Sequence, residues 1–227
     1  MSKFGYFLIF AVAFLSFMPC MARIAVSSDT ISARYAFMEM PASVLDMLSK
    51  DTRFNMLAYY DNDSIFKAPN NLKGSSYLER VTDNFLDVKI TEASTMQLKV
   101  LKTKDGNDIV MVIYTTGREG ESPDSDIRFY DRDFNELQKD KYFPAPKLSE
   151  FFDLRGYKTS MKEIEAMLPF YSILFQANPD TDNISGRLVL DDILTTEDRK
   201  IVDILVIPSV TFEWNGKRYK AIKQSRQ

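Results

Sequence analysis

Residues 85–116 read FLDVKITEASTMQLKVLKTKDGNDIVMVIYTT, and this stretch decides the fold of the 227-residue chain. Apolar and polar residues alternate over 86–90 and again over 96–100, and this period of two predicts two half-buried strands. Asp105-Gly106 predicts a tight turn, because glycine adopts the positive φ that a type I′ hairpin turn requires. Residues 109–114 are apolar at every position, which predicts a central strand covered on both faces. The stretch therefore predicts an antiparallel meander.

The meander is expected to continue downstream. After a loop rich in Gly, Glu, Ser and Pro at 117–125, residues 126–131 predict another strand, with Ile127 and Phe129 on one face. Residues 171–177 and 184–190 then predict a second hairpin, because turn-forming Asn, Pro and Asp residues separate them.

The end of the chain predicts a helix and a hairpin. Thr195 begins a predicted helix that stops before Pro208, since the residue preceding a proline disfavours helical φ and ψ. Residues 210–214 and 217–220 predict a hairpin around Asn215-Gly216. The alternation predicts that Trp214, the one tryptophan of the chain, lies on a buried face of this hairpin against the preceding helix.

Upstream of the meander, residues 41–60 predict one helix or two short ones, with Pro41 at the first helical position. Residues 138–160 predict either short helices or a seam between two lobes. The resulting fold class is α+β: an N-terminal helix or helix pair, an antiparallel β-meander, then a hairpin–helix–hairpin segment, because strict βαβ alternation is absent. A single domain is expected over 35–227.

The first residues predict export. Lys3 precedes an apolar run, and small residues stand at Cys20 and Ala22, which is the layout of a secretory signal peptide over 1–22. Cleavage is expected between Ala22 and Arg23, followed by a flexible lead-in at 23–34 and leaving no stable membrane span. An uncleaved anchor and a lipid on Cys20 are the alternatives.

Composition excludes several chemistries. The chain has 29 Lys plus Arg against 32 Asp plus Glu, and a net charge of −3 gives no electrostatic reason to expect a nucleic-acid partner. It has no His, and its one Cys lies in the predicted leader. The mature chain therefore lacks the residues for a Ser-His-Asp triad, for thiol catalysis and for imidazole or thiolate metal ligands.

Two motifs suggest chemistry but are better explained without it. Ser64-Ile65-Phe66-Lys67 matches the Ser-x-x-Lys pattern of penicillin-recognising enzymes, but no Lys-Thr-Gly motif accompanies it. Four Asp-x-Asp pairs could contribute to calcium loops, although turn formation explains them more simply. We therefore assign no catalytic, cofactor-binding or metal-ligating residue and expect no cofactor. The four Asp pairs are Asp61/Asp63, Asp124/Asp126, Asp131/Asp133 and Asp180/Asp182.

Several structural motifs together resemble a known family. They are Met40-Pro41 followed by Leu45 and Leu48, the strand Asp126 to Tyr130 leading through Phe134 to Leu137, and the final Trp214-Asn215-Gly216. In these motifs, and over roughly 35–220, the chain resembles the secreted Bacteroidales proteins grouped as domain of unknown function 3256. The resemblance implies a Gram-negative cell-envelope setting, and it implies no activity.

Three functions remain open from the sequence. The preferred one is a secreted or periplasmic cell-envelope protein that is not an enzyme and binds an envelope protein or a glycan. The second is a hydrolase of envelope polymers or glycans that uses carboxylates alone, which requires two convergent carboxyl groups with one raised pKa. The third is an assembly protein whose exposed edge strands pair with another chain.

Overall fold

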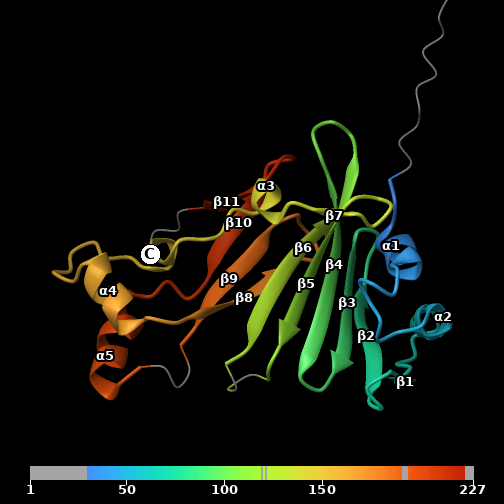
Figure 1. The fold of residues 1–227 in the computed structure, drawn as a ribbon, viewed down its shortest axis with the longest axis horizontal. Coiled ribbons are helices and arrows are strands. Elements are labelled where there is room, and N and C mark those ends of the chain that lie inside the picture. Colours follow the sequence, from blue (N-terminus) through green and yellow to red (C-terminus); the bar gives the residue numbers. More distant parts are fainter. Residues whose placement is uncertain (1–29, 119, 121, 191–193, 223–227) are drawn as a thin grey trace, which may run out of the picture.

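The computed structural model describes residues 30–118, 120, 122–190 and 194–222. The predicted signal peptide, its cleavage point between Ala22 and Arg23, and Cys20 lie outside the described residues. Two antiparallel sheets pack against each other, and helices α1 and α2 cover the other face of the larger sheet (Figure 1). The predicted α+β class is confirmed.

The larger sheet is a meander of seven strands in chain order. The strands predicted from 85–116 and 126–131 are all present, and Asp108 to Ile113 is buried at every position, as expected for a central strand. The sequence did not predict β1, β2 or β7. The strands are β1 (Ala68–Pro69), β2 (Ser75–Val81), β3 (Phe85–Thr91), β4 (Ser94–Lys102), β5 (Asp108–Thr116), β6 (Asp124–Tyr130) and β7 (Glu136–Leu137).

The turn between β4 and β5 differs from the predicted type I′. Gly106 has φ +81°, but Asp105 is not among the residues with positive φ. The Gly106 N–H donates to the Thr103 carbonyl, and the Thr103 N–H donates to the Asn107 carbonyl. These bonds describe a turn that places only glycine in the left-handed region, which is the pattern of a type I turn with a glycine bulge.

The N-terminal helices begin at other places than predicted. Helix α1 (Ala33–Glu39) ends before Pro41, and α2 (Lys50–Tyr60) begins at the Ser49 cap, so Pro41 starts no helix. The predicted lead-in at 23–34 is wrong for its last residues, because Ile31 is buried and Ala33 opens α1. The buried Arg53 of α2 fixes the end of α1 by donating to the carbonyls of Phe37 and Met40.

The second half of the chain forms the smaller sheet and its helices. This sheet has the order β11-β10-β9-β8, and the predicted helix after Thr195 is confirmed, while the last strand begins later than predicted, at Tyr219. The segment 138–160 contains two short helices. The elements are α3 (Lys139–Tyr142), η1 (Leu148–Phe151), α4 (Met161–Met167), β8 (Ser172–Ala177), β9 (Ile184–Val189), α5 (Thr196–Leu205), β10 (Val210–Trp214) and β11 (Tyr219–Ile222).

The larger sheet separates two apolar cores. Side chains on successive residues point to opposite faces, so Leu86 and Val88 face α1 and α2, while Phe85 and Met111 face the smaller sheet. Both faces of β5 are therefore apolar because both are covered.

Gly186 of β9 has no side chain for a steric reason: an added Cβ would lie 3.0 Å from the Phe175 ring and 3.1 Å from the Phe212 ring.

Trp214 is buried in the core between the sheets, at 9% exposed, so its predicted burial is confirmed, but the contacts described for it are not with the preceding helix α5. Its indole Nε1 donates to the Lys102 carbonyl at 2.9 Å, and its ring packs on Tyr142 and Tyr219. Lys104 N–H also donates to the Gly216 carbonyl. The closing hairpin is thus fastened to the β4–β5 turn.

Candidate functional site

The Ser64–Lys67 motif does not form the geometry of a Ser-x-x-Lys nucleophile. That chemistry places serine and lysine one helical turn apart, but α2 ends at Tyr60 and residues 64–67 have no regular secondary structure. The Ser64 hydroxyl donates to the Asn62 carbonyl instead. The interpretation as a chance match in a linker therefore fits the local structure.

The aspartates Asp126, Asp131 and Asp180, each from a different pair, are engaged by cations or by a turn. Burial alone would raise the pKa of Asp126, but hydrogen bonds from Arg128 and Lys139 outweigh it and hold that pKa below its usual range. Asp180 pairs with Arg80 at 2.8 Å. The Asp131 carboxylate accepts the N–H groups of a turn. Within the described ranges, no three acidic side chains are grouped so that they could hold a metal ion.

One carboxyl group comes close to what a hydrolase needs. Burial raises the pKa of Asp87, a hydrogen bond from Gln97 partly opposes this, and Glu79 adds to the rise. However, Asp87 Oδ1 is buried without a partner, and Oδ2 accepts from Gln97 Nε2 at 2.8 Å. Because Oδ1 is buried and Oδ2 is bonded to Gln97, the Asp87 carboxyl does not present a free oxygen at an open cleft, as general acid catalysis requires.

Gln97 uses its other end to cover a sheet edge. Its Oε1 accepts the backbone N–H of Ala177 at 2.9 Å, and the Ser125 hydroxyl accepts the N–H of Phe175 at 3.1 Å. Both amides belong to β8, which is an edge strand of the smaller sheet. The larger sheet therefore satisfies this edge with buried side chains, and Asp87 holds Gln97 in place.

Strand β2 has an edge that is covered much less. Strand β1 pairs with it only at Ser75 and Ser76, and no described strand pairs with that side of Tyr77–Val81, which we call the open edge. The hydrogen bond described there is from Val81 N–H to the Tyr60 hydroxyl at 3.1 Å. An unpaired edge presents a row of backbone donors and acceptors that matches another extended chain.

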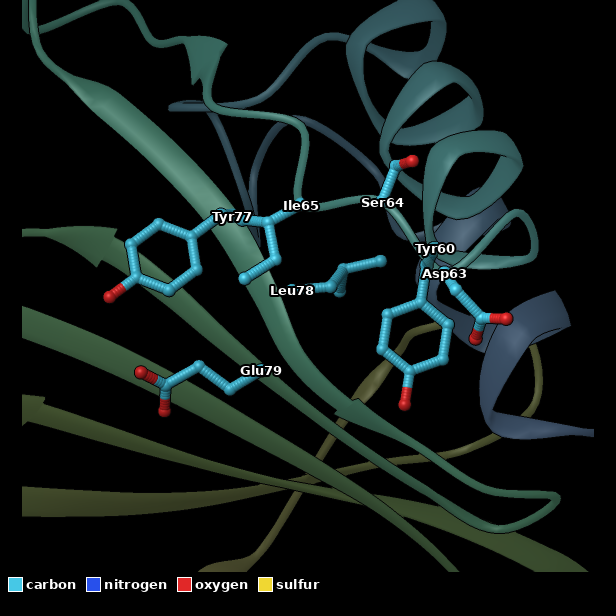
Figure 2. Close-up of a pocket in the computed structure, with 7 residues that line it drawn as sticks. All are labelled: Tyr60, Asp63, Ser64, Ile65, Tyr77, Leu78 and Glu79. Atoms are coloured by element: carbon cyan, nitrogen blue, oxygen red, sulfur yellow. The ribbon is translucent and has the colours of Figure 1, made fainter.

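A hollow of about 500 Å³ lies beside the open edge, and Figure 2 shows the residues that line it. Tyr60 and Asp63 come from the end of α2 and its following turn, while Tyr77, Leu78 and Glu79 come from β2. Ile65 lies beside Tyr77 and is 73% exposed. Asp63 and Glu79 are the charged groups in this lining, so we call it the acidic hollow.

A second hollow of about 630 Å³ adjoins the start of β2. Its described lining includes Lys67, Lys89 and Arg118, and Glu92 is the acid among these described residues, so we call it the basic hollow. Arg118 pairs with Glu92 at 3.0 Å. Lys67 and Lys89 form no ion pair with a carboxylate in the described part of the chain. Tyr77 lines both hollows, and they therefore adjoin each other along the open edge.

This site was not predicted from the sequence. Ser64 and Lys67 were identified only as parts of a motif, and neither β2 nor the two hollows were predicted. The signal that could have found it is the run from Ile65 to Tyr77, where apolar residues stand next to turn-forming Asn and Gly without a helical or strand period.

The fold and its edges define a two-sheet α+β domain. The chain belongs to the family described as "Protein of unknown function (DUF3256)", which matches residues 25–219, so the resemblance is confirmed. It is also similar to the structure of a domain of an uncharacterized protein from Porphyromonas gingivalis W83, with 18% identity and a TM-score of 0.69. That match covers 84% of this chain and 98% of the other, and it shows the fold alone. No curated protein matches, and neither comparison indicates an activity.

No helix in the described part of the chain combines the length and the apolar character that crossing a bilayer requires.

Proposed function

We propose that this protein is an exported, non-enzymatic binding module of the bacterial cell envelope, and that it binds an extended peptide segment of a partner protein at the open edge of β2. The observation that carries the proposal is the contrast between Ser76, where β1 stops pairing, and Tyr77–Val81, which continues β2 without a described strand beside it. An extended peptide gains main-chain hydrogen bonds by adding a strand to such an edge.

The side chains around the edge support a peptide ligand. Ile65 and Tyr77 offer apolar contacts beside the backbone row, and hollows lie on either side of Tyr77. Strand addition obtains affinity from the backbone and selectivity from pockets for alternate side chains. The export part of the proposal rests on the signal-peptide layout of residues 1–22.

A displayed library of peptides of about ten residues, the upper length of common strands, tests the binding proposal. Wild-type protein should enrich peptides that alternate apolar and polar residues, and Ile65→Lys should abolish the enrichment. Ile204→Lys is the matched control, because Ile204 is also exposed, at 51%, but lies on α5. No enrichment, or enrichment that both variants lose equally, contradicts the proposal. If the protein instead bound particular glycans selectively on a glycan array, the ligand would be a glycan, which is the other ligand class predicted from the sequence.

Sequencing the N-terminus of the protein from the envelope fraction tests the export part. A chain that starts at Arg23 supports it, and a cytoplasmic chain that starts at Met1 contradicts it.

A further inference from the structure

We infer that the bound peptide runs antiparallel to β2, with a basic side chain at the acidic hollow and a carboxylate at the basic hollow. This inference rests on the proposed function and adds the direction and the charge order of the ligand: basic, then apolar, then acidic from the amino end to the carboxyl end.

The direction follows from the sheet. Both described neighbours of β2, which are β1 and β3, pair with it antiparallel. Antiparallel ladders are slightly more stable per residue than parallel ones. At the start of β2, Ser75 lines the basic hollow, and further along the strand Glu79 lines the acidic hollow. An antiparallel peptide therefore begins at the acidic hollow and ends at the basic one.

The length of the ladder is limited at both ends. Strand β1 occupies Ser75 and Ser76, so the peptide must leave the edge at Tyr77. At the other end, a bulge between Leu78 and Arg80 interrupts the register of β2. Regular pairing is therefore short, and side-chain contacts beyond its ends must supply part of the affinity. The basic hollow lies at the Ser75 end, and the acidic hollow extends along Tyr77 and Leu78 to Glu79 at the bulge.

The charges at the two ends have opposite sign. Asp63 and Glu79 form no ion pair with a described cation, and none of the described residues that line the acidic hollow is a cation. In the basic hollow Arg118 pairs with Glu92, whereas Lys67 and Lys89 line the hollow without an ion pair among the described residues. A peptide with the complementary order places each charge next to its opposite, whereas the reversed order places like charges together at both ends.

A pair of isomeric peptides tests the inference. Both are acetylated and amidated and share one apolar strand segment; the first has Lys before it and Glu after it, and the second has them exchanged. Wild-type protein should bind the first at least about fivefold more tightly, which corresponds to one exposed charge pair of about 1 kcal/mol. A triple variant with Lys67→Glu, Lys89→Glu and Glu79→Lys should prefer the second. The control Lys162→Glu, on α4, should keep the wild-type preference.

The outcomes separate this inference from the proposed function. Equal affinity for the two peptides, or an unchanged preference in the triple variant, overturns the charge order while the peptide site stands. Binding of neither peptide overturns both. A third peptide, with a free carboxyl terminus in place of Glu, identifies the source of the carboxylate: tighter binding than the first assigns it to the chain terminus, and weaker binding assigns it to a side chain.

Discussion

The edge of β8 and the edge of β2 differ in how their backbone amides are hydrogen-bonded. Amides of Phe175 and Ala177 on β8 donate to side chains of the larger sheet, namely Ser125 and Gln97. The corresponding side of β2 beyond Ser76 has the Tyr60 hydroxyl on Val81 as its described partner. One edge is closed by buried polar groups, and the other has no described strand beside Tyr77–Val81 and two hollows next to it.

The difference shows what closing an edge requires. Gln97 must be buried, must bond Ala177 and must itself be held by Asp87, whose charge is costly to bury. Such an arrangement fits only one strand at a fixed distance. An edge without it remains available for another chain, which is why proteins usually shorten or charge their edges. The bulge at Leu78/Arg80 limits the open edge of β2 but does not cover it.

Removing Trp214 should have the largest effect, because it detaches the far side of the smaller sheet from β4. Trp214→Ala should lower the free energy of unfolding by about 3–5 kcal/mol, the usual cost of deleting a large core aromatic. Trp214→Phe keeps a ring but leaves the Lys102 carbonyl without its donor, so it should cost less. Urea denaturation measures both. In the wild type, native tryptophan emission should be blue-shifted. A red-shifted emission maximum of the wild type, together with an unchanged denaturation midpoint of Trp214→Ala, contradicts the packing.

Opening the closed edge should have the next largest effect. Gln97→Met leaves the Ala177 N–H and the Asp87 carboxylate without their partner, which should cost about 2–3 kcal/mol in chemical denaturation. Gln176→Met is the matched control, because Gln176 is exposed on β8 and its side chain makes no described hydrogen bond. It should change stability by less than about 0.5 kcal/mol. Equal effects of the two variants would show that the Gln97 contacts contribute nothing to closure.

The Asp87 carboxyl should make the closed edge sensitive to pH. Its pKa in the folded protein is raised by burial above the ordinary 3.8, so its stabilising contribution is complete below pH 3.8 and is lost as the pH rises through the folded value. Asp87→Asn removes this loss. The variant should therefore be more stable than the wild type at pH 7, and the difference should vanish below pH 3.8.

Asp126→Asn provides a contrast of opposite sign. The pKa of Asp126 is lowered by Arg128 and Lys139 despite some burial, so its contribution is present above the ordinary 3.8 and is lost as the pH falls through the folded value. This variant should be less stable than the wild type at pH 7. Melting curves from pH 3 to 7 measure both variants, and the same sign for both would refute the assignment of their surroundings.

Substitutions at the open edge should have the smallest effect on stability. Ile65→Lys should change the free energy of unfolding by less than about 0.5 kcal/mol, because its side chain is largely exposed. The same variant should lose peptide binding. A large drop in the melting temperature would mean that Ile65 supports the fold, and the comparison of the two edges would then need a different variant.

The central strands of the larger sheet were predictable from the sequence, whereas β2, which carries the open edge, and helix α1 were not. Alternation over 85–116 reports which residues are buried on each face, and it located β3, β4 and β5. In β2 the bulge between Leu78 and Arg80 breaks the alternation, so Ser75–Val81 shows no strand period. Helix α1 was missed because its seven residues follow a Ser-rich segment.

The candidate site combines distant segments that carry no shared motif. Asp63 and Ile65 follow α2, Glu79 lies on β2, and Lys89 lies on β3. Their meeting depends on how the helix and the strands pack, which residue spacing does not encode. The roles of Gln97 and Asp87 were hidden for the same reason, since each looks like an ordinary polar residue of a half-buried strand.

Amide hydrogen exchange followed by NMR tests the central claim most directly, because it observes both edges in one experiment. In the unbound protein, Phe175 and Ala177 should exchange slowly, and outward amides within Tyr77–Arg80 should exchange fast. Saturation with the peptide of basic–apolar–acidic order should slow exchange on β2 and leave β8 unchanged. Slow exchange on β2 before any peptide is added, or protection that appears elsewhere and not on β2, would contradict the account.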